Sequence, residues 1–365
     1  MKEAFEHRLG RVADEAAAHG FAAAVVAPSP DLRYLTGYDP MPLERATLLL
    51  IRPGREPLLI VPALERALAA DPSAASGVEL VSWTDAEDPY ALAAAALPNA
   101  GRIATNDRMW ASHLLELQAV LPEVSFASAS AVLARLRAVK DEDELAALRR
   151  AGRAADETFR QICTMPFLGR REEEVAADLA RLLVVNGHTR ADFTIVGSGP
   201  NAASPHHEPG GRTILPRDAV VLDFGGELAG YYSDTTRTVV VEEPPSGFTP
   251  VYEVVREAQA AAIDVVRPGA PIQEVDRAAR HLIDAAGYGE LFLHRTGHGI
   301  GLEVHEHPYV IEGNPTPLEP GMTFSVEPGV YVAGDFGVRI EDIVAVTDDG
   351  AERLNRSTRE LQVVG

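Results

Sequence analysis

The sequence predicts an α+β domain made of two similar halves, preceded by a smaller α/β domain. From residue 1 to about 135, helical stretches alternate with short runs of β-type residues, a pattern typical of α/β layers. Farther along, helices followed by strand-rich segments occur twice, which indicates two halves of one α+β domain. We therefore expect a first domain at residues 1–137 and a second domain at residues 138–365.

The first domain begins with a charged stretch, residues 1–8, which we expect to form an amphipathic helix rather than a signal peptide. Strand-like runs follow at residues 22–27, 46–51, 57–61 and 102–104. The longest early apolar run, residues 21–27, is far shorter than the roughly 20 residues that cross a bilayer. The sequence therefore predicts a soluble, cytoplasmic protein.

The second domain begins near a charged segment, residues 139–144, because a long helix with apolar residues at helical spacing follows it. The other expected elements are a helix at 172–186, strands within 193–242, helices within 249–286 and strands within 292–347. Each half of this domain is thus expected to place helices before strands.

The composition excludes several classes of partner. The 33 basic residues stand against 54 acidic ones, and the resulting net charge of −21 repels nucleic acid and anionic lipid. The single cysteine, Cys163, rules out an internal disulfide and any zinc site built from several thiolates. We expect no nucleic-acid or membrane partner, which leaves small molecules, peptides and metal cations.

A first acidic pair lies on a predicted β-hairpin. Asp223 ends an apolar run that leads into two glycines, and Asp234 opens the run that ends at residue 241. If the turn is centred between Leu228 and Ala229, the two aspartates lie directly opposite each other, about 5 Å apart. Two like charges so placed call for a cation between them, although turn-flanking aspartates are also common on exposed hairpins.

A second acidic pair repeats the arrangement. Glu327 and Glu341 lie in strand-like apolar runs, and a turn centred on Gly334 places them opposite each other. Burying these carboxylates without compensation is costly, so four converging acids would need a multivalent cation. Between the pairs lie His294, His298 and His305, with glycines on both sides of His298 that permit close backbone approach.

These residues resemble the pita-bread metallopeptidases, a family that includes methionine aminopeptidase, aminopeptidase P and prolidase. The family's metal ligands follow the order Asp, Asp, His, Glu, Glu, and the matching residues are Asp223, Asp234, His298, Glu327 and Glu341. The resemblance covers nearly the whole chain. A domain before the catalytic one, containing residues 33–37, is similar to the creatinase-type domain of the proline-directed branch, prolidase and aminopeptidase P.

The resemblance implies two divalent metal ions per chain, with Mn²⁺ favoured and Co²⁺ or Zn²⁺ as alternatives. We expect Asp223 on one ion, His298 and Glu327 on the other, and Asp234 and Glu341 bridging. A hydroxide shared by the ions would attack the scissile carbonyl. Glu327 would accept and pass on the proton, and the catalytic residue His305 would stabilise the developing oxyanion.

The resemblance also implies substrate-binding residues. His206 matches a histidine that lines the family's pocket, with His207 beside it as an alternative, and His294 and His305 match further pocket histidines. Tyr331 and Arg339 match residues that support the second acidic pair and the substrate. The expected catalytic residues are therefore Glu327, His305 and His206.

The implied substrates are small peptides with proline in second position. We favour an Xaa-Pro dipeptidase over an Xaa-Pro aminopeptidase, which acts on longer peptides. A dipeptidase must bind a free carboxylate, yet Tyr309 stands where some prolidases carry an arginine. Arg45, on the loop at residues 38–45, could supply this charge from the partner in an expected homodimer, or could be an ordinary surface arginine.

A different class of function is a metal-free relative, either a creatinase-like hydrolase or a binding protein of the same fold. Such relatives lose metal-ligating carboxylates, whereas all four acids and His298 are present here. The sequence therefore favours a metal-dependent peptidase.

Overall fold

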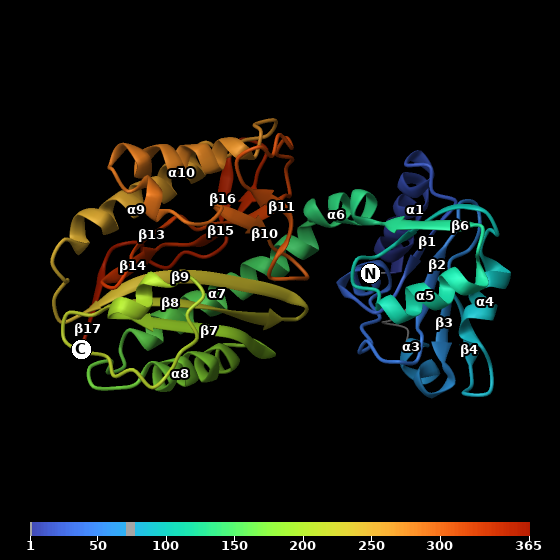
Figure 1. Cartoon of the computed structure of the whole chain (residues 1–365), viewed down its shortest axis with the longest axis horizontal. Coiled ribbons are helices and arrows are strands. Elements are labelled where there is room, and N and C mark those ends of the chain that lie inside the picture. Colours follow the sequence, from blue (N-terminus) through green and yellow to red (C-terminus); the bar gives the residue numbers. More distant parts are fainter. Residues whose placement is uncertain (1, 71–76) are drawn as a thin grey trace. The chain divides into compact units, whose positions relative to one another are not determined.

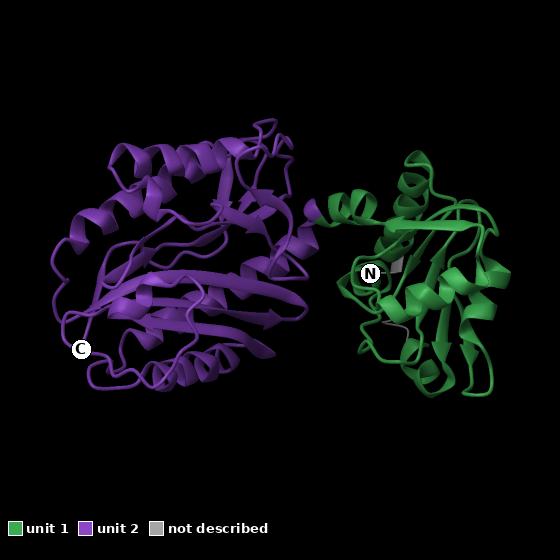
Figure 2. Ribbon diagram, viewed as in Figure 1, with its two compact units in different colours: residues 1–137 green, residues 138–365 purple. Residues whose placement is uncertain are grey.

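The computed structural model describes residues 2–70 and 77–365, so residue 1 of the expected first helix lies outside the described residues. The chain divides into two compact units, Met1–Arg137 and Ala138–Gly365 (Figure 2). The first is an α/β unit and the second an α+β unit, which confirms the predicted fold class. Among the described residues, no helix combines the length and the apolar character needed to cross a membrane.

A six-stranded mixed sheet forms the centre of the first unit, in the order β4-β3-β2-β1-β5-β6 (Figure 1). Its elements are α1 (Lys2–Ala18), β1 (Ala23–Val26), α2 (Pro30–Thr36), β2 (Leu48–Ile51), β3 (Leu58–Pro62), a 3₁₀ turn η1 (Ala63–Glu65), α3 (Arg66–Ala69), β4 (Glu79–Trp83), α4 (Pro89–Ala96), β5 (Gly101–Thr105), α5 (Ala111–Val120), β6 (Val124–Ser128) and α6 (Ser130–Ala138). The strands β1, β2 and β3 are buried along their whole length, because helices cover the sheet.

The first half of the second unit packs two helices against a four-stranded sheet, in the order β17-β9-β8-β7. Its elements are α7 (Glu142–Ile162), α8 (Glu172–Val185), β7 (Arg190–Ser198), a 3₁₀ turn η2 (Gly199–Ala203), β8 (Ala219–Leu228) and β9 (Tyr231–Val241), with β17 (Gln362–Val364) from the C-terminal end. A capping box between Asp141 and Glu144 starts α7, which explains why the charged segment precedes this long helix.

The second half repeats the order of helices and strands. Its elements are α9 (Phe248–Asp264), α10 (Gln273–Ala285), a 3₁₀ turn η3 (Gly289–Leu291), β10 (Gly297–Gly299), β11 (Glu306–Val310), β12 (Thr323–Val326), β13 (Gly329–Val332), β14 (Phe336–Arg339), β15 (Asp342–Val346) and β16 (Ala351–Arg353). In this unit α9 and α10 lie on one side and α8 on the other, with the sheets between them (Figure 1). The predicted pair of similar halves is confirmed.

The hairpin β8–β9 has a different register from the one the sequence predicts. Asp223 pairs with Thr236, and Asp234 pairs with Gly225, so the two aspartates are diagonal neighbours rather than directly opposite. The cause is a two-residue turn in which Ala229 and Gly230 both have positive φ, 52° and 92°. Because side chains alternate along a strand, both carboxylates still lie on the same face.

The second acidic pair has the predicted register, although its strands are interrupted. Val326 pairs with Asp342, and Gly329 pairs with Arg339, so Glu327 and Glu341 face each other between two short ladders. Outside the ladder, the Glu327 N–H donates to Thr296 O (2.8 Å) and the Glu341 N–H donates to Thr236 O (3.0 Å). The second of these bonds joins the two halves of the unit directly.

A buried arginine fastens the two halves beneath the acidic pairs. The Arg237 side chain is only 1% exposed and forms an ion pair with the fully buried Asp342, at 2.6 Å. Its guanidinium donates four further hydrogen bonds, to the carbonyl oxygens of Thr236, Glu341, Ser357 and Thr358. All five N–H groups of this guanidinium are therefore used.

Candidate metal centre and active site

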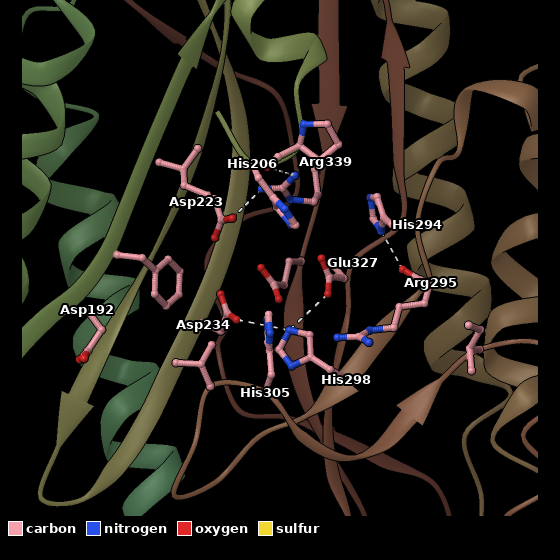
Figure 3. Close-up of a pocket in the computed structure, with 16 residues that line it drawn as sticks. Asp192, His206, Asp223, Asp234, His294, Arg295, His298, His305, Glu327 and Arg339 are labelled. Carbon is pink, nitrogen blue, oxygen red and sulfur yellow. Dashed lines mark hydrogen bonds and ion pairs between the residues drawn. The ribbon is translucent and has the colours of Figure 1, made fainter. Parts of the chain in front are cut away.

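A cavity of about 780 Å³ opens into the second unit between its two halves. It is lined by Asp192, Phe193, Ile195, Pro205, His206, Asp223, Asp234, His294, Arg295, His298, Val304, His305, Ile311, Glu327, Arg339 and Glu341 (Figure 3). Both acidic pairs and four of the histidines named from the sequence lie on this one cavity. Of the predicted site residues, Tyr331 and Arg45 do not line it.

Four of the residues expected to bind metal, Asp223, Asp234, His298 and Glu327, point toward the centre of the cavity (Figure 3), and the fifth, Glu341, also lines it. Ligand atoms of Asp223, Asp234 and Glu341 lie within 4.8 Å of one another, and so do those of His298, Glu327 and Glu341. The two groups share Glu341. This overlap provides two adjacent positions for cations with one carboxylate common to both.

The His298 imidazole presents a lone pair to these carboxylates. Its Nδ1 lies 3.1 Å from Gly299 O and carries the proton, because a carbonyl can only accept. The free Nε2 is 3.3 Å from Glu327 Oε1 and 3.6 Å from Asp234 Oδ2. Burial, followed by the nearby His305, lowers the pKa of His298 to about 3. A neutral imidazole with Nε2 free is the form that binds metal.

The carboxylates are crowded and incompletely satisfied. Burial and the neighbouring acids raise the pKa of Asp234 and of Glu341 well above their usual values, and burial raises the pKa of Glu327 to about 7. Asp223 Oδ1 and Glu341 Oε1 are buried without a hydrogen-bond partner among the described residues. Buried carboxylate oxygens without a partner destabilise the folded state unless a cation binds them. The residues therefore fit a divalent metal.

A second layer of polar residues orients the ligands. Thr236 Oγ1 donates to Glu341 Oε2 (2.7 Å) and accepts from Arg339 Nε (3.1 Å). The other end of the Arg339 guanidinium donates to Asp223 Oδ2 (2.5 Å). Ser325 Oγ donates to Glu327 Oε1 (3.1 Å). Such partners fix the direction of each ligand before the metal binds.

Arg339, Tyr331 and His294 form a chain of hydrogen bonds along one wall of the cavity. Arg339 Nη1 donates to the Tyr331 hydroxyl (2.9 Å), which lies 2.8 Å from His294 Nε2. His294 Nδ1 lies 2.7 Å from Arg295 O, so Nδ1 carries the proton and Nε2 accepts from Tyr331. Burial lowers the pKa of His294 to about 4, which keeps this ring neutral. Tyr331 thus lies behind the cavity wall and holds His294.

Two adjacent histidines have separate surroundings. His206 lies on the cavity, whereas His207 Nε2 is 2.8 Å from Glu172 Oε2. Glu172 is fully buried and also accepts hydrogen bonds from Ser198 and Asn201, which ties together the loop that carries both histidines. The structure therefore places His206, not His207, on the cavity.

His305 lies across the cavity from His206 and close to His298. The centroids of the His298 and His305 rings are 4.0 Å apart. Burial, with a smaller contribution from Arg295, lowers the pKa of His305. A neutral His305 retains one N–H for a substrate oxygen.

Arg45 lies in the first unit, on its surface. Its guanidinium forms ion pairs with Asp85 (3.0 Å) and Glu44 (2.9 Å). Within this chain it has the surroundings of an ordinary surface arginine. Its predicted reach into a partner's site stays a prediction.

Arg295 is the main cavity residue that sequence reasoning missed. Its guanidinium carbon lies 4.3 Å from the centre of the Tyr309 ring, and no acidic residue of the described chain forms an ion pair with it. The apolar residues Phe193 and Ile195 were missed as well. Their signal is the alternation of β7, in which Ile195 pairs with Asp223 and so lies on the same face.

Comparison with known proteins places both units in families. The model of metallopeptidase family M24 matches residues 146–348, and that of the creatinase/prolidase N-terminal domain matches residues 8–139. The probable dipeptidase PepE of Mycobacterium tuberculosis is 44% identical over 368 residues, which cover 99% of this chain and 97% of that protein. The Xaa-Pro dipeptidase of Lactobacillus delbrueckii subsp. lactis is 38% identical, with coverage of 95% and 96%.

A solved structure gives the same result. The crystal structure of dipeptidase PepE from Mycobacterium ulcerans has a TM-score of 0.94 and 43% identity, and the match covers 100% of this chain and 98% of that one. The chain belongs to metallopeptidase family M24, which confirms the predicted resemblance and the prediction of an enzyme. Membership implies hydrolysis of peptides with the use of divalent metal.

Proposed function

We propose that this protein hydrolyses Xaa-Pro dipeptides with two divalent metal ions. The observation that carries the proposal is a cavity that combines four crowded carboxylates with Arg295, which forms no ion pair with an acid of the described residues. The carboxylates supply a metal site, and the arginine supplies a partner for the free carboxylate of a dipeptide. Relatives named probable dipeptidase and Xaa-Pro dipeptidase support the same substrate class.

In the proposed centre, Asp223 would hold one ion, His298 and Glu327 would hold the other, and both ions would draw on Asp234 and Glu341. Glu341 belongs to the groups of both Asp223 and His298, and Asp234 forms a further group with His298 and His305, which supports this division. Bound ions of this kind polarise the scissile carbonyl and lower the pKa of water. The mixture of carboxylate oxygens and one imidazole suits Mn²⁺, with Co²⁺ or Zn²⁺ as alternatives.

The chain's own residues move the proton and hold the substrate. Glu327, steadied by Ser325 Oγ, accepts a proton from the attacking water and passes it to the leaving proline nitrogen. His305 donates a hydrogen bond to the oxygen on which negative charge develops. His206 and His294, which both line the cavity, contact the bound peptide.

Proline is recognised by shape, because the bond before it lacks an N–H group. Phe193, Ile195 and Val304 supply apolar surface to the cavity. The carboxylate that follows the proline is proposed to bind Arg295. Tyr309, which stands where some prolidases carry arginine, stacks on Arg295 and so holds that charge at the cavity.

The test compares three peptides under saturating Mn²⁺ or Co²⁺. Ala-Pro should be hydrolysed, whereas Ala-Ala and Ala-Pro-Ala should be cleaved far more slowly. If only the tripeptide is cleaved, the dipeptidase assignment is wrong and the protein is an Xaa-Pro aminopeptidase. Failure to bind about two transition ions per chain after metal-replete preparation would contradict the proposed centre.

Replacing Arg295 separates the two possible carboxylate partners. Arg295→Met should raise KM for Ala-Pro by about 30-fold, since a charge-assisted hydrogen bond is lost. Arg45→Ala is the matched control and should leave KM unchanged if Arg45 is a surface arginine. The reverse result would assign the carboxylate to Arg45 of the partner in the proposed homodimer, whose existence light scattering would check.

A further inference from the structure

We propose that Lys140 is a positioning residue that acts through Glu306 on His305. The inference rests on the proposed function in one respect, since it takes His305 to contact the substrate. It adds to that function a residue from the segment that leads into α7, far in sequence from every predicted site residue.

The residue type at position 140 is unusual in this chain. Of the 33 basic residues, 31 are arginines, and the only lysines are Lys2 and Lys140. A chain that otherwise uses arginine for positive charge has a lysine at this one interior position.

Lys140 and Glu306 form a buried ion pair. The distance from Nζ to Glu306 Oε1 is 2.6 Å, and the two side chains are 1% and 6% exposed. The Lys140 backbone is fixed as well, because its N–H donates to Gly321 O (2.9 Å). The Lys140 ammonium therefore holds the Glu306 carboxylate in place.

The ion pair packs closely against Gly301. A Cβ added at Gly301 would lie 2.7 Å from Glu306 Oε1 and 2.9 Å from Lys140 Cε. The pair thus fills the volume that this glycine leaves open. A side chain at position 301 would therefore press on both members of the ion pair.

Glu306 is the residue that ends the loop bearing His305. This loop, residues 300–305, joins β10 to β11 at a point where the ladder is irregular, between His298 and Gly299. One end is held by the bond from the Tyr232 N–H to Gly301 O (3.0 Å). The other end is held at Glu306, by its pairing with Gly299 and by its ion pair with Lys140.

The direction of the His305 ring depends on this anchoring. Within residues 2–70 and 77–365, the ring makes no hydrogen bond, and its ring contact is with His298. Atoms of Asp234 and His298 lie within 4.8 Å of a His305 ring nitrogen, but without a hydrogen bond the ring takes its direction mainly from its backbone. Because Glu306 follows His305 directly, a fixed Glu306 fixes the backbone from which His305 projects into the cavity.

Stability alone does not account for the pair. Apolar residues of similar volume often replace a buried ion pair without loss of stability, because taking two charges out of water is costly. A charge pair is directional, whereas an apolar contact is not. The pair is therefore suited to hold Glu306, and His305 with it, in one position.

The test is a double-mutant cycle in the full-length, metal-loaded enzyme. Lys140→Met should lower kcat for Ala-Pro by about 10- to 100-fold, the cost of misplacing a group by about 1 Å. KM should change by less than about threefold, and the bound metal should be unchanged. In the His305→Ala background, Lys140→Met should have no further effect on kcat. An equal loss in both backgrounds would overturn the proposal.

Two further variants control for folding. Lys140→Met/Glu306→Gln removes both charges, so no unpaired charge stays buried, and it should retain the low kcat while remaining folded. Arg149→Met breaks a different ion pair, which joins α7 to Glu352 at 2.7 Å, and should leave kcat unchanged. Wild-type kcat in the double variant, or a loss with Arg149→Met equal to that with Lys140→Met, would contradict a specific role for Lys140.

A spectroscopic readout separates this inference from the proposed function. The imidazole ¹⁵N signals of His305, assigned by their absence in His305→Ala, should shift in Lys140→Met and not in Arg149→Met. An unchanged His305 signal would overturn the inference even if the enzyme cleaves Ala-Pro. The proposed function fails if Ala-Pro is not cleaved or if His305→Ala retains wild-type kcat. In either case, a shifted His305 signal in Lys140→Met would still support the positioning by Lys140.

Discussion

The two acidic pairs meet in one cavity but are built on different backbones. Asp223 and Asp234 lie on an unbroken hairpin and reach the centre with short side chains. Glu327 and Glu341 lie where the second hairpin is interrupted, and they reach the centre with longer ones. A regularly paired strand can bring the short side chain of an aspartate to the centre. The longer side chain of a glutamate reaches the centre even where the strand pairing is interrupted.

The interruption in the second hairpin has a structural benefit. Because the Glu341 N–H is free of its own ladder, it bonds to Thr236 O on the strand of the first pair. Thr236 Oγ1 in turn donates to the Glu341 carboxylate. The second acidic pair is therefore hydrogen-bonded to the strand of the first pair through both its backbone and its side chain.

The largest effect should come from removing the acid common to both ligand groups. Glu341→Gln should lower kcat/KM for Ala-Pro by at least about 10³-fold, because both proposed cation positions lose a carboxylate. Metal analysis should show fewer ions per chain than in the wild type. Glu290→Gln, which changes an exposed acid on η3, is the control and should match the wild type. Full metal occupancy in Glu341→Gln would contradict the shared role.

Removing the Arg237–Asp342 ion pair between the two halves should mainly lower stability. Arg237→Met should reduce the free energy of unfolding by about 3–5 kcal/mol, since it leaves part of the buried Asp342 charge without its partner. Urea unfolding measures this change. Arg237→Met/Asp342→Asn should recover a large part of the loss, and an equal loss in both variants would show that the ion pair is not the cause.

The second pair should give the metal-free protein an unusual dependence on pH. Burial raises the pKa of Glu327 to about 7, so the folded state binds a proton that the unfolded chain has already lost. The free energy of unfolding should therefore fall as pH rises from about 4.5 to about 7, by up to about 3 kcal/mol.

Urea unfolding in the presence of EDTA, from pH 4.5 to pH 8, checks this sign. Saturating Mn²⁺ should remove the decline, because the cation takes the place of the proton. Glu327→Gln should give a flatter profile than the wild type. A metal-free protein that becomes more stable over this interval would contradict the prediction.

The smallest effects should come from the two turns. Ala229 is a non-glycine residue at φ 52°, so Ala229→Asn should stabilise the first hairpin by roughly 0.5–1 kcal/mol through an Asn-Gly turn. Gly334 has φ 79° and open space around it, so Gly334→Ala should destabilise the second hairpin by about 1 kcal/mol. Thermal unfolding measures both, and shifts of the same sign would contradict the assignment of the turns.

The same contrast explains which parts of the fold could be predicted from the sequence. The register of the second hairpin was predictable because Gly334 marks the turn at which the chain reverses. The register of the first hairpin was not, because Ala229 adopts a backbone conformation that alanine rarely takes. The alternation of helices and strands gave the fold class, since it follows from local patterns alone.

The site was predictable only where its residues stand in recognisable motifs. Both acidic pairs and His298 come together as expected, although their roles in binding metal stay predictions. The separate surroundings of His206 and His207 depend on Glu172, which lies more than thirty residues earlier in the chain. Arg295 was missed because its candidate role follows from its contact with the Tyr309 ring and from the lack of an ion pair with any acid of the described residues, which the sequence does not show.

The burial of Lys140 has a practical consequence for chemical labelling. Amine-reactive reagents can modify a lysine only when solvent reaches it, and Lys2 is the only other lysine in the sequence. Acylation at Lys140, followed over time by mass spectrometry, would therefore record how often the segment around His305 opens. The chain thus contains a native reporter of local opening beside its active site, with no label introduced by mutation.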